Sequence, residues 1–300
     1  CTTTGSSHWK KDAGYDIDAV KTNLKPLQLD TEPEYHSSEI AYFRYYGIHF
    51  ETPSGPDNSV RHLFGSFDSG EYRLAGHVFL PDKPKGTVFL IHGYFDHTGI
   101  LRHLIRFCTD QGFAVAAYDL PGHGLSTGDR GEIENFSDYV SVLDTFIRIC
   151  RPVLPKPYFL IGHSTGGGIA FEHLLNQKEP VFERIILLSP LVRFACWKPA
   201  KAAYYLMRPF VKSVPSRTRS TTSSDPDFVE FLNKDPLRIR HIPLKWVNAV
   251  YQWNRRIRDC EPISKPVLII QGTADDVVDW RYNIPFLKEK IISAKIIKIK

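Results

Sequence analysis

The feature that most constrains the fold is the pentapeptide GHSTG at 162–166, which directly follows the apolar run 158–161. Short apolar runs of this kind are typical of strands buried on both faces of a mostly parallel sheet. Glycines two residues before and after Ser164 permit a turn so sharp that the serine backbone is strained. The pattern therefore predicts a strand, a tight turn that carries the serine, and a helix that begins at once. The alternative is a serine that only caps a helix.

Apolar runs and helix-like stretches alternate along most of the chain, which predicts the α/β class: a mostly parallel sheet with helices on both faces. A hairpin with strands at 63–67 and 72–80, around a turn at 68–70, is expected ahead of this alternation. The further predicted strands are 87–91, 114–118, 158–161, 185–188, 267–270 and 294–300, and the predicted helices are 99–111, 136–149 and one directly after Ser164.

Two segments fall outside this alternation. Residues 1–40 are polar and rich in Pro, Lys and Asp, and we interpret them as an N-terminal extension or tether ahead of a domain at 41–300. The gap between the predicted strands 185–188 and 267–270 is too long for a loop and carries helical patterns of its own. It predicts a helical cap, at about 190–265, inserted between two core strands.

Ser164 is the predicted nucleophile, because a strained turn between a strand and a helix presents its hydroxyl at the edge of the sheet. A serine that attacks a carbonyl group needs two backbone N–H groups to stabilise the negative charge that develops on oxygen. We predict that these oxyanion donors belong to Thr165 and to Tyr94, which lies in the loop after the predicted strand 87–91. His92, in the same loop, is predicted to hold the loop together rather than to act as a base.

The acidic partner is expected after the strand 267–270. Asp275 is the first choice, Asp276 is the second and Asp279 is a more distant candidate; the alternative is an acidic cluster in a surface turn. No cysteine–histidine cluster with the spacing of metal ligands occurs, and neither does a nucleotide or haem signature. The sequence therefore predicts neither a metal ion nor a cofactor.

Four ordered motifs, covering about residue 43 to the end, resemble α/β-hydrolases of the monoacylglycerol lipase, lysophospholipase and serine-aminopeptidase-like branch. The resemblance implies the α/β-hydrolase fold. Asp96 stands where this branch usually has Glu, a change that bears on the entrance to the site rather than on the chemistry. The motifs are HGYFDH at 92–97, DLPGHGLS at 119–126 with GDR at 128–130, GHSTGG at 162–167 and GTAD at 272–275.

The resemblance also implies a catalytic histidine that follows the acid, on the loop after the last strand. All 12 histidines of this sequence precede Asp275, and the last is His241. We therefore expect the histidine, its loop and a final helix beyond Lys300. Residues 1–300 by themselves are expected to hydrolyse esters poorly, because they lack the general base.

The favoured function is that of a serine ester hydrolase that acts on single-acyl lipids through an acyl-enzyme intermediate. The resemblance implies that the aromatic, apolar cap lines an acyl-chain tunnel. Residues 193–259 hold fourteen Lys/Arg and five Asp/Glu, a net charge of +9, which favours a zwitterionic or anionic headgroup and contact with a membrane surface. The alternative is a solvated, charge-rich face. Lysophospholipid and monoacylglycerol both fit.

Three other functions stay open. They are a small-ester or cinnamoyl esterase, an aminopeptidase of the same fold, and a non-catalytic lipid-binding protein of the cell envelope. An aminopeptidase needs an acidic anchor for the amine of its substrate, which the basic cap disfavours. Nucleic acid is not an expected partner, because RRM, zinc-finger and helix-turn-helix signatures are absent.

The cysteines bear on the cellular location. Cys1, followed by a tract of Thr, Gly and Ser, resembles the mature end of a bacterial lipoprotein. This predicts a lipid anchor at Cys1 and a place in the cell envelope; the alternative is an arbitrary boundary and a cytoplasmic protein. Cys196 and Cys260, at the two ends of the basic segment, are expected to form a disulfide or to stay as buried free thiols.

Overall fold

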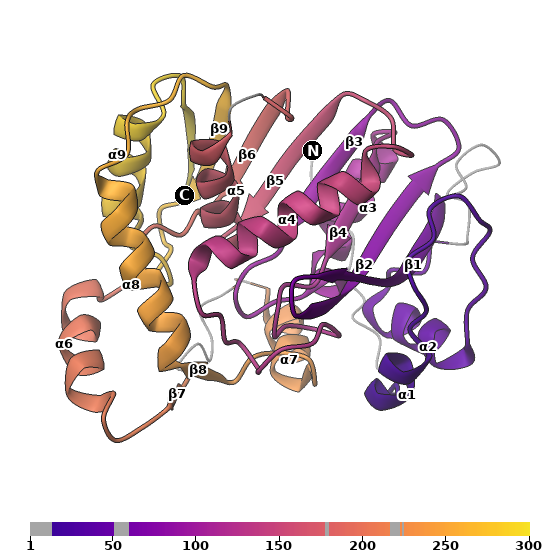
Figure 1. The fold of residues 1–300 in the computed structure, drawn as a ribbon, viewed down its shortest axis with the longest axis horizontal. Coiled ribbons are helices and arrows are strands. Elements are labelled where there is room, and N and C mark those ends of the chain that lie inside the picture. The colour runs from indigo at the N-terminus through magenta and orange to yellow at the C-terminus, as the bar shows by residue number, and fades with distance from the viewer. Residues whose placement is uncertain (1–13, 51–59, 178–179, 217–222, 224) are drawn as a thin grey trace.

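The apolar runs form one eight-stranded sheet in the order β1-β2-β4-β3-β5-β6-β9-β10 (Figure 1). The computed structural model describes residues 14–50, 60–177, 180–216, 223 and 225–300. The first two strands are antiparallel to their neighbours, and all the others are parallel. The strands are β1 (Val60–Ser69), β2 (Tyr72–Pro81), β3 (Thr87–Ile91), β4 (Ala114–Tyr118), β5 (Tyr158–His163), β6 (Arg184–Leu188), β9 (Val267–Gly272) and β10 (Lys295–Ile299).

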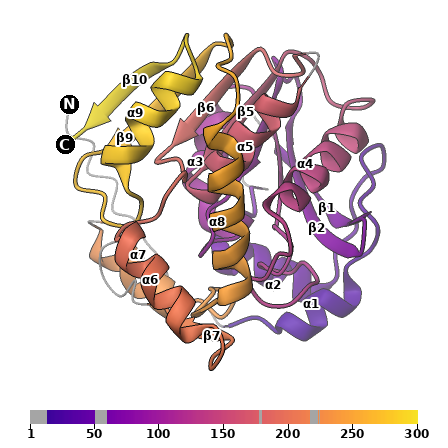
Figure 2. The ribbon, with the colours of Figure 1, turned by 60° about the vertical axis from the view of Figure 1, so that its left-hand side comes forward.

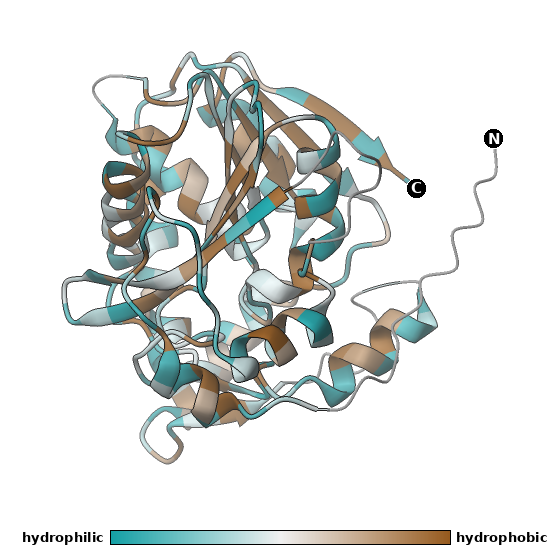
Figure 3. Cartoon of the chain, turned by 90° about the vertical axis from the view of Figure 1, so that its right-hand side faces the viewer, coloured by the Kyte–Doolittle hydropathy of each residue, from teal (hydrophilic) through white to brown (hydrophobic). Residues whose placement is uncertain are grey.

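Helices cover both faces of the sheet, which confirms the predicted α/β architecture. Successive side chains of a strand point to opposite faces. On β3, Phe89 and Ile91 accordingly join the core under α4, α5, α8 and α9, whereas Val88 and Leu90 join the core under α2 and α3. The helices show both hydrophilic and hydrophobic stretches around the sheet (Figure 3). They are α1 (Ile17–Asn23), α2 (Ser37–Tyr46), α3 (Arg102–Asp110), α4 (Phe136–Cys150), α5 (Thr165–Asn176), α6 (Trp197–Met207), α7 (Pro226–Lys234), α8 (Leu244–Arg258) and α9 (Trp280–Lys290), with a 3-10 turn at Thr98–Leu101.

Three helices and a short ribbon lie between β6 and β9 in the chain. These are α6, α7, α8 and the antiparallel pair β7 (Ser213–Pro215) and β8 (His241–Pro243). Figure 2 shows α8 running along the face of the sheet that α5 covers, with α6 to the left of its lower half. All the apolar residues of α8 are buried, for example Trp246, Val250 and Trp253. The helical spacing of its apolar residues therefore serves packing first.

Helix α2 and the residues 25–27 ahead of it pack on the sheet. Tyr42, Phe43 and Tyr46 of α2 are fully buried, so α2 crosses the predicted boundary at residue 40. Residues 25–27 run along β1: Leu27 N–H donates to Ser66 O at 2.8 Å and Ser66 N–H donates to Lys25 O at 2.7 Å. The sequence did not predict α1 or α2, because the apolar residues of these helices form only short stretches within or next to the polar first 40 residues.

The structure leaves Cys196 and Cys260 as free thiols, so the predicted alternative of a disulfide between them is wrong. The alternative of free thiols is confirmed, but Cys196 is exposed and Cys260 is half-buried rather than buried. Cys1, the predicted site of lipidation, lies outside the described residues. Within the described ranges, no helix is both long and apolar enough to cross a bilayer.

Candidate active site

The turn around Ser164 is the strained feature that the sequence predicts. Ser164 has φ 50° and ψ −112°, in a region that non-glycine residues rarely adopt, and α5 begins at the next residue. A Cβ on Gly162 would lie 2.2 Å from Gly166 O, and a Cβ on Gly166 would lie 2.3 Å from Ile91 O. Both positions therefore admit only glycine, because β5, the turn and β3 approach each other too closely for a side chain.

The loop after β3 lies directly beside this turn. A Cβ on Gly93 would lie 3.4 Å from Ser164 Cβ and 3.1 Å from His163 Nδ1. Tyr94, the next residue, is anchored at its far end, because its hydroxyl donates to Gly131 O at 2.8 Å. Its ring packs on Trp246 of α8 with a centroid distance of 3.9 Å. The backbone around Tyr94 is thus held next to Ser164 by the cap and by the loop at 119–131.

Thr165 is the first residue of α5 and is almost fully buried. The N–H groups in the first turn of a helix have no acceptor within the helix, and the helix dipole makes that end positive. An amide at this position suits an oxyanion that forms at Ser164. The two predicted donor residues, Tyr94 and Thr165, therefore flank the serine on separate elements.

His92 holds the loop together, as predicted. Its Nδ1 lies 2.7 Å from Gly93 O, and its Nε2 accepts a hydrogen bond from Leu120 N–H at 2.9 Å. The ring is fully buried, and burial lowers its pKa below the ordinary value although Asp119 opposes this effect. Both ring nitrogens are used by the backbone, so His92 joins the loop after β3 to the loop after β4.

Asp96, which replaces the usual Glu of this motif, faces the residue before the serine. Asp96 Oδ2 lies 3.4 Å from His163 Nδ1. Burial would raise the pKa of Asp96, but the imidazoles of His163, His92 and His97 outweigh it and hold the pKa below its ordinary value. The rim of the site therefore carries a carboxylate at neutral pH, and sequence reasoning did not find this pair.

The three aspartates after β9 have different surroundings. Asp275 Oδ1 accepts hydrogen bonds from the N–H groups of Val277 at 2.9 Å and Val278 at 3.0 Å, and Oδ2 accepts one from Gln271 Nε2 at 3.0 Å. Asp276 is exposed, and Asp279 caps the N-terminus of α9. Asp275 accepts three hydrogen bonds, which fix its orientation as an orienting carboxylate requires.

A chain of backbone hydrogen bonds connects Ser164 to the loop of Asp275. Leu191 N–H donates to Ser164 O at 2.9 Å, and Ala195 N–H donates to Val277 O at 2.9 Å. The segment between them follows β6, the strand between β5 and β9. Since carboxyl ends of parallel strands share one edge of a sheet, this edge carries both Ser164 and Asp275.

The loop after α7 covers the same region from the cap. Arg130, in the loop after β4, donates hydrogen bonds to Leu237 O and Gly124 O, which joins the two loops. A Cβ on Gly131 would lie 2.8 Å from Ile239 Cδ1, so glycine is needed where the cap rests on this loop. Asp235 Oδ2 lies 3.0 Å from His97 Nε2, and both side chains are fully buried.

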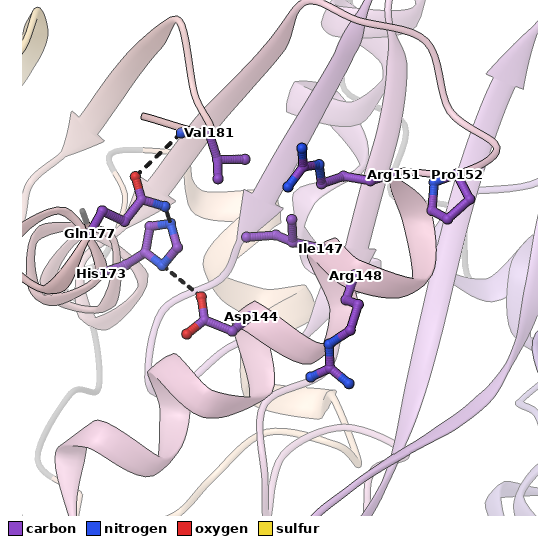
Figure 4. A pocket seen from close by; sticks show the side chains of 8 residues that line it. All are labelled: Asp144, Ile147, Arg148, Arg151, Pro152, His173, Gln177 and Val181. Carbon is purple, nitrogen blue, oxygen red and sulfur yellow. Dashed lines mark hydrogen bonds and ion pairs between the residues drawn. The ribbon is translucent and has the colours of Figure 1, made fainter. Parts of the chain in front are cut away.

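A hollow of about 370 Å³ lies between the carboxyl ends of α4 and α5, and none of the predicted site residues lines it (Figure 4). His173 Nδ1 pairs with Asp144 Oδ1 at 2.9 Å, and His173 Nε2 contacts Gln177. Arg148 and Arg151 lie where helix carbonyls leave partial negative charge, and cations stabilise such ends. These arginines therefore have a structural role, and we place no substrate here.

Comparison with known proteins decides the family. Residues 82–299 match Hydrolase_4, the serine aminopeptidase S33 family. The chain belongs to this family. It is similar to phospholipase YtpA of Bacillus subtilis (strain 168), with 28% identity over 205 residues that make up 66% of this chain and 79% of that protein. It is also similar to monoglyceride lipase of Mus musculus, with 29% identity over 237 residues, or 75% of this chain and 76% of that protein.

A solved structure agrees with this membership. The crystal structure of Paleococcus ferrophilus monoacylglycerol lipase superposes with a TM-score of 0.66 at 27% identity, and the match covers 76% of this chain and 88% of that chain. The family match and this likeness confirm the resemblance and the α/β-hydrolase fold. Membership in this family makes the chain a hydrolase, and it leaves the substrate and the residue roles to be proposed.

Proposed function

We propose that this protein is a serine hydrolase that cleaves the ester bond of single-acyl lipids through an acyl-enzyme intermediate. The observation that carries the proposal is the strained Ser164 with the Gly93–Tyr94 backbone directly beside it. Such strain is kept only where the surrounding structure enforces it, and it concentrates at functional sites. A lipid-binding protein without catalysis would gain nothing from this strain.

The reaction has two steps. Ser164 Oγ attacks the ester carbonyl carbon while its proton passes to a histidine, and the N–H groups of Thr165 and Tyr94 hold the oxyanion. The ester C–O bond then breaks, the glycerol or glycerophospho alcohol leaves with the proton, and the acyl group stays on the serine. Water attacks this acyl-enzyme and releases the fatty acid, and Asp275 orients the histidine throughout.

We place the histidine after β10, as the order serine, acid, histidine requires. β10 runs parallel to β9, and Ile299 pairs with Gly272. Thr273 N–H donates to Ile299 O at 2.8 Å, two residues before Asp275. A residue that follows β10 therefore enters the space beside the Asp275 loop.

The proposed class of substrate rests on the names of the relatives and on the aromatic, basic cap. The relatives reported above are named as a phospholipase and as monoglyceride lipases. With the natural full-length protein, we expect kcat/KM for a monoacylglycerol or a lysophosphatidylcholine to exceed that for a diacylglycerol or methyl caffeate about 100-fold. Preference for methyl caffeate would favour the cinnamoyl esterase. Preference for an aminoacyl anilide would favour the aminopeptidase.

The end of α6 and the turn that follows it are the proposed contact with the membrane. The apolar tip there consists of Tyr205, Leu206, Phe210 and Val211, which are 49%, 74%, 82% and 38% exposed. Arg208 and Lys212 lie beside it, so apolar and cationic groups occur together, as at a membrane interface. Acylation of Cys1, which we propose as a second anchor, would place the protein in the cell envelope, since stable anchoring takes two signals.

Vesicles of phosphatidylcholine mixed with phosphatidylglycerol test this contact. We expect the double substitution Leu206→Ser and Phe210→Ser to weaken vesicle binding at least about tenfold, because each side chain buries apolar area in the bilayer. Hydrolysis of a soluble short-chain ester stays unchanged. Phe107→Ser is the control, since Phe107 on α3 is 61% exposed and lies outside the tip. Equal vesicle binding by the double variant and the wild type would contradict the proposal.

A further inference from the structure

We propose that Tyr46, in the N-terminal helix α2, is a positioning residue for the active site. Its hydroxyl acts through Asp235 and His97 on the loop at 93–97, which carries one of the two oxyanion donors. The inference rests on the proposed function of this loop. Tyr46 lies outside residues 82–299, the part of the chain that matches the family.

The contacts form a continuous buried path. Tyr46 donates its hydroxyl proton to Asp235 Oδ1 at 2.7 Å, while Asp235 Oδ2 lies 3.0 Å from His97 Nε2. Leu237 N–H also donates to Asp235 Oδ1, at 2.9 Å. Tyr46, Asp235 and His97 are all fully buried. One carboxylate of the cap therefore joins the N-terminal helix to the loop after β3.

The Tyr46 ring is fixed independently of its hydroxyl. It packs edge-on against His97, with a centroid distance of 4.6 Å and an interplanar angle of 82°. A Cβ on Gly99 would lie 2.6 Å from Tyr46 Cγ, so only glycine leaves room for the ring there. Tyr15 supports the arrangement from α1's side, with its hydroxyl 2.9 Å from that of Tyr46. Removal of the hydroxyl alone therefore leaves the ring in place.

From His97 the path continues along the backbone of the loop that carries Gly93 and Tyr94. His97 follows Asp96 in the loop whose Gly93 lies against Ser164, and Thr98 N–H, the next amide, donates to Asp119 Oδ1 at 2.8 Å. When Tyr46 no longer donates to Asp235, the carboxylate loses one of the bonds that fix it against His97. Small displacements of oxyanion donors have large effects on rate, because the donors must meet the charge of the transition state.

The test compares Tyr46→Phe with Tyr42→Phe in the natural full-length protein. Both tyrosines belong to α2 and are fully buried, but the Tyr42 hydroxyl has no hydrogen-bond partner in the part of the chain that the structure describes. Active-site titration with a fluorophosphonate counts the competent sites. We expect Tyr46→Phe to lower kcat per titrated site about tenfold with KM nearly unchanged. Tyr42→Phe is expected to keep both values.

Hydrogen exchange of the amides at 93–99 gives a second readout, independent of activity. We expect these amides to exchange faster in Tyr46→Phe than in the wild type, and to exchange at the wild-type rate in Tyr42→Phe. Unchanged kcat per site with unchanged exchange would overturn the inference, and so would equal effects of the two variants. A wild-type protein that neither labels nor hydrolyses would contradict the proposed function, and exchange at 93–99 would still decide whether Tyr46 holds the loop.

Discussion

Ser164→Ala is expected to lower ester hydrolysis by a factor on the order of 10⁵ and to abolish labelling by a fluorophosphonate. The substitution removes the atom that forms the acyl-enzyme, so the oxyanion donors and the bound substrate alone remain to accelerate the reaction. Initial rates on a monoacylglycerol, at equal concentrations of folded protein, measure this effect.

Ser189→Ala is the matched control for this loss. Ser189 follows β6, the strand next to β5, and its φ of 43° is also positive. It thus shares the positive φ of Ser164 without the proposed role. We expect the fluorophosphonate to label Ser189→Ala normally. Equal loss of labelling in both variants would mean that a disturbance of the turns after the strands, rather than removal of the Ser164 hydroxyl, prevents the reaction.

Asp235→Ala is expected to lower the free energy of unfolding by about 3–5 kcal/mol, as the breaking of buried ion pairs does. The substitution leaves the His97 ring and the Tyr46 hydroxyl buried without the carboxylate that they contact. Chemical denaturation measures the loss.

The pair of the exposed Asp144 with His173 supplies the control. Asp144 is 55% exposed, whereas its partner His173 is buried. Solvent screens such a carboxylate, so Asp144→Ala is expected to cost less than about 1 kcal/mol. A loss of similar size in both variants would contradict the assignment of Asp235 as a buried structural carboxylate.

The effect of Asp235→Ala depends on pH. Burial would raise the pKa of Asp235, but His97 and the hydrogen bonds from Tyr46 and Leu237 hold that pKa below its ordinary value. The contribution of Asp235 to stability is therefore present above about pH 4 and is lost as pH falls through the folded pKa. Burial would lower the pKa of His97, but Asp235 raises that pKa above its ordinary value. The contribution of His97 to stability is therefore complete below about pH 6.5 and is lost as pH rises through the folded pKa. The difference in stability between wild type and variant is therefore largest between about pH 4 and about pH 6.5. A difference independent of pH would show that the pair is not charged.

The strands could be predicted from sequence to within a few residues. β3 and β4 match their predictions at both ends, because runs that are apolar on both faces stop abruptly where the chain leaves the core. The turn at Ser164 could be predicted because the apolar run before it also stops abruptly. The glycines on both sides of Ser164 indicated, in addition, that backbone segments approach closely there. The hairpin turn falls at Gly70–Glu71, since Ser69 pairs with Tyr72, and the sequence placed it slightly earlier.

The N-terminal helices and the buried network could not be predicted. Aromatic residues surround α2 on several sides, since Tyr42 packs on Phe64 of β1 while Tyr45 packs on Phe231 of α7. A helix buried on several sides shows no single apolar stripe. Asp235 lies 189 residues from Tyr46 and 138 from His97, and no local pattern marks such a contact.

The most direct test of the central assignment is the intact mass of the natural full-length protein before and after reaction with a fluorophosphonate, in wild type and in Ser164→Ala. The proposed mechanism predicts one adduct per wild-type chain and none in the variant, because the reagent phosphonylates only a serine that the site activates. An unmodified wild-type protein, or an adduct that persists in Ser164→Ala, would contradict the assignment of Ser164 as the nucleophile.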